Sequence, residues 1–378
     1  MHKVHWLSCF GDASGYGHVA RAYVKAMNEA GWDIKIGVNN FTIDDQTRYL
    51  GDFFEYFKPL IVENINRIKA NERIFVSHNT PDILFVQPQF KINSAMSMWE
   101  TNSINSNSAK RCNDFDFLMT ASEFSKSAFI TGGVTLPIHV IPHIVPRITL
   151  PRDEKLHEFK KDRLTFLSIF EWHLGKGYDL LLKGFIEAFK NNPNVLLILK
   201  VNDFVSPKTL KERVFKYIKS IKKDLVYPSI LPICHPCLPE VIYSLYEVSD
   251  ICVSLSRREA FSLNVADSIV HKKLTICPSM GGHREYANEN NSILINSDWS
   301  KIVNIEPERR NYLGQYWIES DLNDFIEKLK IVETNWREPK KEDLEELKKE
   351  SELVRIKLSP ETILNEFDKI FSFYEKKT

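Results

Sequence analysis

Two acidic side chains in one segment, Glu259 and Asp267, have the chemistry and the spacing to hold a polyhydroxylated ligand. The pattern of residues 254–286 predicts a strand, a turn, a helix, a second strand and a second turn. In a helix that begins near Phe261, the first amides lack internal partners and carry partial positive charge, which suits hydroxyls and phosphates. Glu259 would lie in the turn and Asp267 would project from the helix towards the same cleft. We therefore expect the two carboxylates to hold two parts of one ligand.

The runs EAFSLNVAD (residues 259–267) and PSMGGHRE (residues 278–285) resemble the donor-site signature of the retaining glycosyltransferases with the GT-B fold, family four. In that signature seven residues separate two glutamates, and here Asp267 stands at the second place. The resemblance implies that Glu259 holds hydroxyls of the transferred sugar and that Asp267 holds the ribose of the donor. It also implies this set of donor-binding residues: Gly15, Gly17, Lys176, Arg258, Ala260, Phe261, Ser262, Leu263, Asp267, Gly281 and Gly282.

The segment SIFEWHLGKGYD (residues 168–179) resembles the strand and loop in which this family places an Arg and a Lys on the donor's diphosphate. Lys176 matches the Lys, but Glu171 stands at the place of the Arg, and a carboxylate cannot neutralise phosphate. The candidates for the missing cation are Arg257, Arg258, Lys200 and His173. No DxD pair lies at a strand end, so we expect cations and helix N-termini, rather than a metal or a cofactor, to stabilise the leaving diphosphate.

The first glycine-rich loop, GDASGYGHVA (residues 11–20), follows an apolar strand and precedes a helical pattern. Gly15, Gly17 and Ala20 fit the dinucleotide-binding fingerprint, which keeps an NAD-dependent oxidoreductase open as an alternative. That fingerprint needs an acid after the second strand, where this chain has Asn39 and Asn40. In the transferases that the chain resembles, the same loop brings amides to the donor's diphosphate or to the acceptor. A tight turn that requires small residues is the simpler alternative.

A second group of motifs in the first half resembles a bacterial subset of these transferases. The run MWETN (residues 98–102) is similar to their WETN-like box, and KRCNDFD (residues 110–116) to the CN-x-x-D segment that follows it. His78, at the end of a predicted strand, matches the first-domain His that contacts the transferred sugar. The alternatives are a buried Trp beside a surface Glu, and a His that is merely a satisfied polar residue. The resemblance assigns these residues to the acceptor side: Ser14, Tyr16, Trp99, Glu100 and Thr101.

The order of predicted elements indicates an α/β protein with two doubly wound parallel sheets. Strands alternate with helices from residue 4, the alternation breaks at Pro142, Pro146 and Pro151, and it restarts at residue 164. We therefore expect a Rossmann-like acceptor domain over residues 1–148 and a Rossmann-like donor domain over residues 149–358, facing each other across a cleft. By resemblance, a last helix, residues 359–378, packs back on the first domain.

Composition excludes several classes of protein. The 378 residues include 50 Lys plus Arg and 50 Asp plus Glu, so no global charge attracts nucleic acid or an acidic membrane. The chain shows neither a signal-peptide pattern nor a run of ~20 apolar residues, and we expect a cytoplasmic protein without an integral membrane segment. One local exception is the basic pattern at residues 207–223, which predicts an amphipathic helix. Its basic face is either solvated or in peripheral contact with a membrane or a nucleic acid.

These observations together predict a metal-independent, retaining glycosyltransferase that moves a sugar from a nucleoside-diphosphate sugar to an acceptor hydroxyl. Its catalytic residues would be Glu259, His78 and Lys176. A glycan of a surface polysaccharide is the expected acceptor, and a modified DNA base is an alternative because of the basic helix. The departures at Glu171 and Asp267 leave a third alternative, a protein that binds a nucleotide sugar without catalysis.

Overall fold

A computed structural model describes residues 1–11, 14–38, 52–62, 68–148, 158–203, 205–221, 228–337 and 341–377. The chain forms two compact units, which are described separately below. Unit 1 comprises residues 1–145 and 356–378, and unit 2 comprises residues 146–355. The boundary expected from the sequence lay after residue 148, and the return to the first domain was expected at residue 359.

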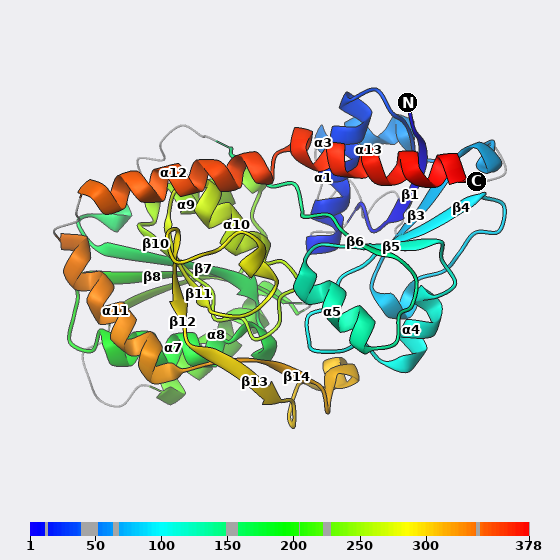
Figure 1. Cartoon of the computed structure of the whole chain (residues 1–378). Helices are drawn as coiled ribbons and strands as arrows, with labels where there is room; N and C mark the ends of the chain where they lie inside the picture. Colours follow the sequence, from blue (N-terminus) through cyan, green and yellow to red (C-terminus); the bar gives the residue numbers. More distant parts are fainter. Residues whose placement is uncertain are drawn as a thin grey trace. The chain divides into compact units, whose positions relative to one another are not determined.

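The described part of unit 1 contains a six-stranded parallel sheet with the strand order β2-β1-β3-β4-β5-β6 (Figure 1). Its strands are β1 (Lys3–Ser8), β2 (Asp33–Val38), β3 (Ile74–His78), β4 (Ile92–Met96), β5 (Phe117–Thr120) and β6 (Ile138–Val140). The α-helices between them are α1 (Gly15–Glu29), α3 (Asp52–Phe57), α4 (Ser106–Cys112) and α5 (Glu123–Thr131). The order reverses between β1 and β3, and ligands of such sheets bind outside the carboxyl ends of the strands at this switch point.

The last helix, α13 (Pro360–Lys377), packs on unit 1 through one apolar face. Its buried residues Ile363, Phe367, Phe371 and Tyr374 recur every three or four positions, which places them on one side of the helix. Phe367 meets the ring of Trp6 edge to face at 5.8 Å, and Tyr374 stacks on Phe117 at 4.0 Å. The helix therefore contributes to the core of unit 1.

Unit 2 contains a second six-stranded parallel sheet, in the order β12-β11-β10-β7-β8-β9 (Figure 1). Its strands are β7 (Leu164–Glu171), β8 (Val195–Asn202), β9 (Ser229–Ile233), β10 (Ile251–Val253), β11 (Leu274–Pro278) and β12 (Ser292–Ile295). The described α-helices are α7 (Tyr178–Ala188), α8 (Pro207–Ile221), α9 (Pro239–Val248), α10 (Leu263–Val270), α11 (Leu322–Arg337) and α12 (Lys341–Lys357). Read from β9, the order is that of the Rossmann fold, with its switch point between β7 and β10.

Burial explains why the central strands of unit 2 read as continuous apolar runs. Seven of the eight residues of β8 are buried, because helices cover both faces of a doubly wound sheet. One side of the sheet packs on α7 and α11, where Gly184 leaves room for the ring of Phe325. The prediction of two α/β units with parallel sheets is therefore confirmed.

A two-stranded extension of unit 2 was not predicted from the sequence. Strands β13 (Ser297–Lys301) and β14 (Tyr316–Ser320) pair antiparallel, and the 3-10 helix η7 (Pro307–Tyr312) lies between them. We call residues 297–320 the arm. The amide of Ile318 in the arm donates to the carbonyl of Arg257 at 2.9 Å, which attaches the arm to the loop that follows β10.

The basic amphipathic helix predicted at residues 207–223 is present as α8. Leu210, Val214 and Ile218 are buried, as the spacing of one residue in four predicts. Phe215 is 38% exposed because it lies one position, or about 100° of helix rotation, beyond Val214. Among the described helices, none combines the length and apolar character required to cross a bilayer.

Candidate active site

Two of the residues predicted to hold the donor sugar nucleotide, Lys176 and Glu259, lie in loops at the switch point of the unit 2 sheet. Strand β7 ends at Glu171 and leads into the 3-10 helix η5 (Leu174–Lys176). Its neighbour β10 ends at Val253 and leads, through the loop of residues 254–262, into α10. Both loops therefore leave the same edge of the sheet side by side, which is where the Rossmann topology places ligands.

Lys176 and Glu259 form an ion pair at this edge. The ammonium Nζ of Lys176 donates to Glu259 Oε1 at 2.7 Å, and each side chain is 16% exposed. Two motifs separated by 83 positions, one with a predicted phosphate cation and one with a predicted sugar carboxylate, thus meet in one place. A partly exposed cation next to a carboxylate can bind an anion and a sugar hydroxyl that belong to the same ligand.

Glycine is required where the two loops touch. Gly177 has φ of +69°, and a Cβ there would lie 1.9 Å from the carbonyl oxygen of Leu255. A side chain at position 177 would push the Lys176 loop away from the Glu259 loop, and the left-handed backbone would be strained as well. The close approach of the two loop backbones therefore explains why a glycine follows Lys176.

Arg257, a candidate for the missing cation, is held inside the protein by two carboxylates. Its guanidinium binds Asp179 at 2.6 and 3.0 Å and Glu319 of the arm at 2.7 and 2.8 Å. Burial opposes the charged form, but the hydrogen bonds and charges of the two carboxylates outweigh it and hold the pKa of Arg257 above its ordinary value. We conclude that Arg257 anchors the loop and the arm rather than a ligand.

Arg258 was predicted to bind the donor, but its side chain is fully buried. The guanidinium carbon lies 4.0 Å from the ring centroid of Tyr312, a residue of the arm. Gly175 packs against the other side, where a Cβ would lie 2.5 Å from Arg258 Nε. The charge of Arg258 acts on His173 of the neighbouring loop, and its contact with the donor stays a prediction.

The turn that carries Gly281 and Gly282 supports the Glu259 loop from the other side. The amide of Gly282 donates to the carbonyl of Glu259 at 3.0 Å, and a Cβ on Gly282 would lie 1.8 Å from the carbonyl oxygen of Ala260. The hydroxyl of Tyr286 lies 2.6 Å from the carbonyls of Phe261 and Ser262. The two glycines, predicted to cradle phosphate, thus also have a packing role that the geometry defines.

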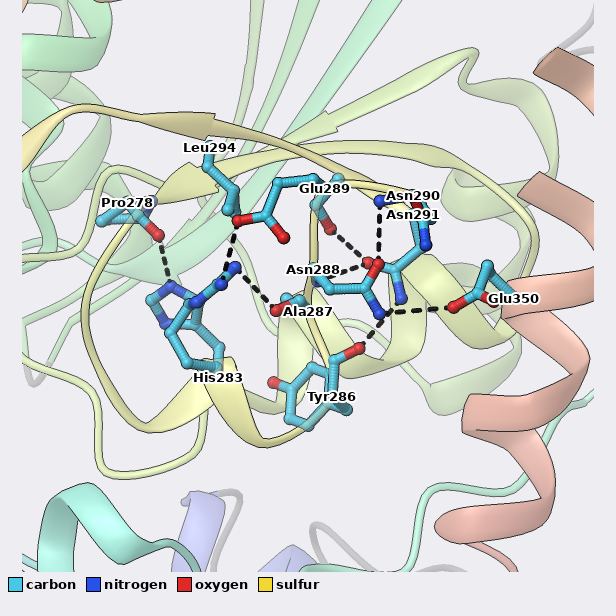
Figure 2. A network of polar contacts seen from close by, with 12 residues as sticks. Pro278, His283, Tyr286, Ala287, Asn288, Glu289, Asn290, Asn291, Leu294 and Glu350 are labelled. Atoms are coloured by element: carbon cyan, nitrogen blue, oxygen red, sulfur yellow. Dashed lines mark hydrogen bonds and ion pairs between the residues drawn. The ribbon is translucent and has the colours of Figure 1, made fainter. Parts of the chain in front are cut away.

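A network of polar contacts fixes this turn (Figure 2). The ring of His283 binds the carbonyl of Pro278 at 2.7 Å, and Asn291 donates to the carbonyl of Tyr286 at 2.9 Å. Asn288 continues the network to Glu350 of α12 at 3.3 Å. Tyr286 accepts from Asn291 within the network and donates from its hydroxyl to the carbonyls of Phe261 and Ser262, so it links the network to the Glu259 loop.

Ser262 carries backbone strain at the start of α10. Its φ of 67° and ψ of 81° lie in the left-handed region, which a serine rarely adopts. Its Oγ is buried and has no hydrogen-bond partner in the described part of the chain. The helix begins at Leu263, two residues later than predicted, because this turn at Ser262 precedes it. Strained residues of this kind gather at ligand sites.

Asp267 lies in the second turn of α10 and is largely withdrawn from water. Burial raises the pKa of Asp267 to about 7 from 3.8. The charge of its carboxylate in turn helps to raise the pKa of Tyr243, Tyr246 and Tyr286, which identifies the phenols around it. A carboxyl group in this state can either accept or donate a hydrogen bond near neutral pH.

Glu171 has a partner that the sequence did not reveal. Its Oε1 contacts Nη2 of Arg309, a residue of η7 in the arm. Lys200, another candidate for the missing cation, is buried and donates to the carbonyl of Val201 at 3.3 Å. Burial lowers the pKa of Lys200 and also that of His173. Both side chains are buried, 5% and 4% exposed respectively.

In unit 1, the glycine-rich loop begins a helix as predicted. Ser14 is the N-cap of α1, and its Oγ accepts from the amide of Gly17 at 3.1 Å. That amide is therefore already occupied by a local hydrogen bond. The hydroxyl of Tyr16 accepts from the amide of Met98 at 3.1 Å, which joins the loop after β1 to the segment after β4. A ligand role for Ser14, Gly15, Tyr16 and Gly17 stays a prediction.

His78 is fully buried at the carboxyl end of β3, next to the switch point of the unit 1 sheet. The indole of Trp6 donates to His78 Nδ1 at 3.3 Å, so the proton of a neutral ring resides on Nε2. His78 Nε2 has no hydrogen-bond partner in the described residues. The ring of Tyr16 lies 5.1 Å away between centroids. The Nε2–H of His78 can therefore donate one hydrogen bond, which a sugar hydroxyl would accept.

The tautomer of His78 is directly measurable. Burial lowers its pKa to about 3 from 6.5, so we expect the ring to stay neutral from pH 5 to pH 8. Long-range ¹H–¹⁵N spectra should show the Nε2–H form throughout, and Trp6→Phe should increase the share of the other tautomer. A ring that gains a proton near pH 6.5 would contradict this assignment.

The residues of the WETN-like box lie mostly inside the protein. Trp99 and Thr101 are buried, and Trp99 Nε1 donates to Thr101 Oγ1 at 2.6 Å and to the carbonyl of Ser103 at 2.8 Å. Glu100 is the member of the triplet with partly exposed surface. Their assignment to the acceptor side stays a prediction, and Glu100 is the residue best placed to test it.

Comparison with known proteins identifies the architecture. No family model matches the chain. A curated protein, putative glycosyltransferase 45 of Sulfolobus islandicus filamentous virus, is 25% identical over 240 residues, which are 61% of this chain and 60% of that protein. The match therefore spans less than two thirds of the relative's length.

Solved structures match over nearly the whole chain. HepE of Anabaena in complex with UDP has a TM-score of 0.69 at 13% identity, covering 98% of this chain and 99% of that one. Sucrose-phosphate synthase of Thermosynechococcus elongatus has a TM-score of 0.67 at 13% identity, covering 100% of both chains. These neighbours are glycosyltransferases built from two Rossmann-like domains. Together with the two six-stranded parallel sheets, they show that this chain has the GT-B fold.

Proposed function

We propose that this protein is a glycosyltransferase that uses a nucleoside-diphosphate sugar as donor and retains the configuration at the anomeric carbon. The observation that carries the proposal is the Lys176–Glu259 ion pair at the switch point of the unit 2 sheet, next to the N-terminus of α10. The cation would face the diphosphate, and the carboxylate would face the sugar that leaves it. The resemblance of both motifs to family four supports the retaining course.

In this proposal the transferred sugar passes through an oxocarbenium-like transition state. Negative charge develops on the leaving phosphate oxygen, where Lys176 and the amides at the start of α10 stabilise it. Glu259 holds sugar hydroxyls, and by the family resemblance the Nε2 hydrogen of His78 is assigned to a sugar hydroxyl. The leaving phosphate takes the proton of the acceptor hydroxyl, so the protein needs no nucleophile of its own. A glycan hydroxyl is the proposed acceptor.

UDP is the proposed nucleotide. Structures similar to this chain include HepE with UDP-glucose and the pneumococcal O-GlcNAc transferase GtfA with UDP and GlcNAc. UDP, GDP and ADP should be compared by isothermal titration calorimetry, and the sugar by mass spectrometry of the products from a panel of donors. Tight binding of NAD with no binding of any nucleoside diphosphate would favour the oxidoreductase. Donor binding without transfer or hydrolysis would favour a non-catalytic binding protein.

The charge state of Asp267 gives this proposal a pH dependence. Its folded-state pKa of about 7 lies above the unfolded value, so its contribution to stability is present at low pH and is lost as the pH rises through about 7. Ribose hydroxyls would donate to the ionised form and lower that pKa. We therefore expect the affinity for UDP to rise about tenfold from pH 6 to pH 8.

Asp267→Asn is the control for this pH effect, because an amide cannot ionise. For this variant, the pH dependence of the affinity for UDP should reflect only the ionisation of UDP itself. The variant should also be at least as stable as the wild type at pH 8. If the affinity for UDP changes equally with pH in the wild type and in Asp267→Asn, Asp267 does not bind the ribose.

A further inference from the structure

We propose that Arg309 of the arm supplies a second positive charge to the donor's diphosphate and that Glu171 positions it. This inference rests on the proposed function and adds to it a binding residue and a positioning residue that lie 138 positions apart in the sequence.

The location of the pair is the first argument. Glu171 is the last residue of β7, at the carboxyl edge of the sheet where the Lys176 loop begins. Arg309 contacts it through a guanidinium nitrogen, and the side chains of Glu171 and Arg309 are 26% and 23% exposed. Both therefore reach the surface at the edge where the donor would lie. A fully buried pair could not serve a ligand.

The second argument is the convergence of positive charge. His173, two residues after Glu171, has a lowered pKa, first because of its burial and then because of the charges of Lys176, Arg258 and Arg309. Three cations from three separate segments thus lie within electrostatic reach of one imidazole. The carboxylates of Glu171, Glu259 and Glu306 lie among these cations, and a diphosphate that binds here would share the cations with them.

The third argument is that the arm is fixed at this place. Glu306 Oε1 accepts from the amide of Leu174 at 2.5 Å, and Tyr312 stacks on Arg258. These contacts flank Arg309 on both sides within η7. They set the position of its backbone, while Glu171 sets the position of its guanidinium. The side chain is therefore ordered before a ligand arrives, which lowers the entropic cost of binding.

Guanidinium chemistry allows Glu171 and a phosphate to share Arg309. An arginine carries five N–H donors on a rigid plane, so one edge can bind a carboxylate while another binds phosphate oxygens. In the absence of ligand, Glu171 balances the charge. When a diphosphate binds, Arg309 would keep Glu171 on one side and gain the phosphate on the other.

The experiment compares the binding of UDP and of uridine by calorimetry in four proteins. Arg309→Ala should weaken UDP binding about 10- to 100-fold, the range of one charge-assisted hydrogen bond, and should leave uridine binding unchanged. Arg310→Ala is the matched control, because it removes the same charge from the next, exposed position of η7. Its UDP affinity should equal that of the wild type. The double variant Glu171→Arg/Arg309→Ala returns a guanidinium to the same edge and should recover most of the lost affinity.

The outcomes separate the inference from the proposed function. If the wild type binds none of UDP, GDP and ADP, the proposed function fails and the inference fails with it. If the wild type binds UDP and Arg309→Ala binds it equally well, the inference alone is overturned. If Arg309→Ala loses uridine and UDP to the same extent, Arg309 has a structural role only, and the inference is again overturned. Melting temperatures of all four proteins identify any variant whose fold is impaired.

Discussion

Glu259→Ala should lower the rate of sugar transfer by about 10³-fold while UDP binds as tightly as before, or more tightly. Transfer falls because the hydroxyl contacts that stabilise the sugar in the transition state disappear, and removing one such group typically lowers the rate 10²- to 10³-fold. UDP has no sugar to lose, and its diphosphate gains sole use of Lys176, which Glu259 otherwise engages at 2.7 Å. Transfer is measured by mass spectrometry and UDP binding by calorimetry.

Lys176→Ala, in contrast, should lose both sugar transfer and tight binding of UDP. Without the ammonium, the diphosphate loses one of its proposed cations in the ground state and in the transition state, so UDP affinity and transfer fall together. Lys183→Ala and Glu240→Ala are matched controls, since both residues are exposed on helices of unit 2 and should change neither quantity. Normal transfer by folded Glu259→Ala would contradict the assignment of this site.

The sequence predicted the sheets of both units because each strand carries its signal locally. Strand β9 (Ser229–Ile233), helix α9 (Pro239–Val248) and strand β10 (Ile251–Val253) follow the alternation of strands and helices expected after residue 164. Apolar runs between turn signals are sufficient for such predictions, because burial on both faces imposes them.

The partners of charged side chains were beyond sequence reasoning. In the sequence, Glu171 stands where the family has an Arg that binds the diphosphate. Its ion pair with Arg309 of the arm became apparent only in the structure. Likewise, the sequence pattern indicated only that Trp6 is an apolar residue of a strand. In the structure its indole N–H determines which nitrogen of His78 carries the hydrogen. Such pairs depend on strand order and on the docking of the arm, which periodicity along the chain does not encode. For the same reason the sequence did not reveal that the side chain of Arg258 is buried.

Arg257→Ala should destabilise unit 2 by about 3–5 kcal/mol, because it leaves two carboxylates without their buried cation. Asp179 belongs to α7 and Glu319 to β14, so the guanidinium joins a helix, the Glu259 loop and the arm in one cluster. A loss of this size should lower the midpoint of urea unfolding by about 1–2 M.

The surface pair between Arg213 and Asp203, at 3.0 Å, provides the matched control for Arg257. Arg213 is exposed on α8, and an exposed ion pair contributes at most about 1 kcal/mol, so Arg213→Ala should leave the midpoint almost unchanged. Equal midpoints for Arg257→Ala and Arg213→Ala would show that the cluster does not stabilise the unit. If Arg257→Ala also weakens UDP binding while Arg213→Ala does not, the arm is loosened together with its anchor, since the same loop carries Arg257 and Glu259 and the same arm carries Glu319 and Arg309.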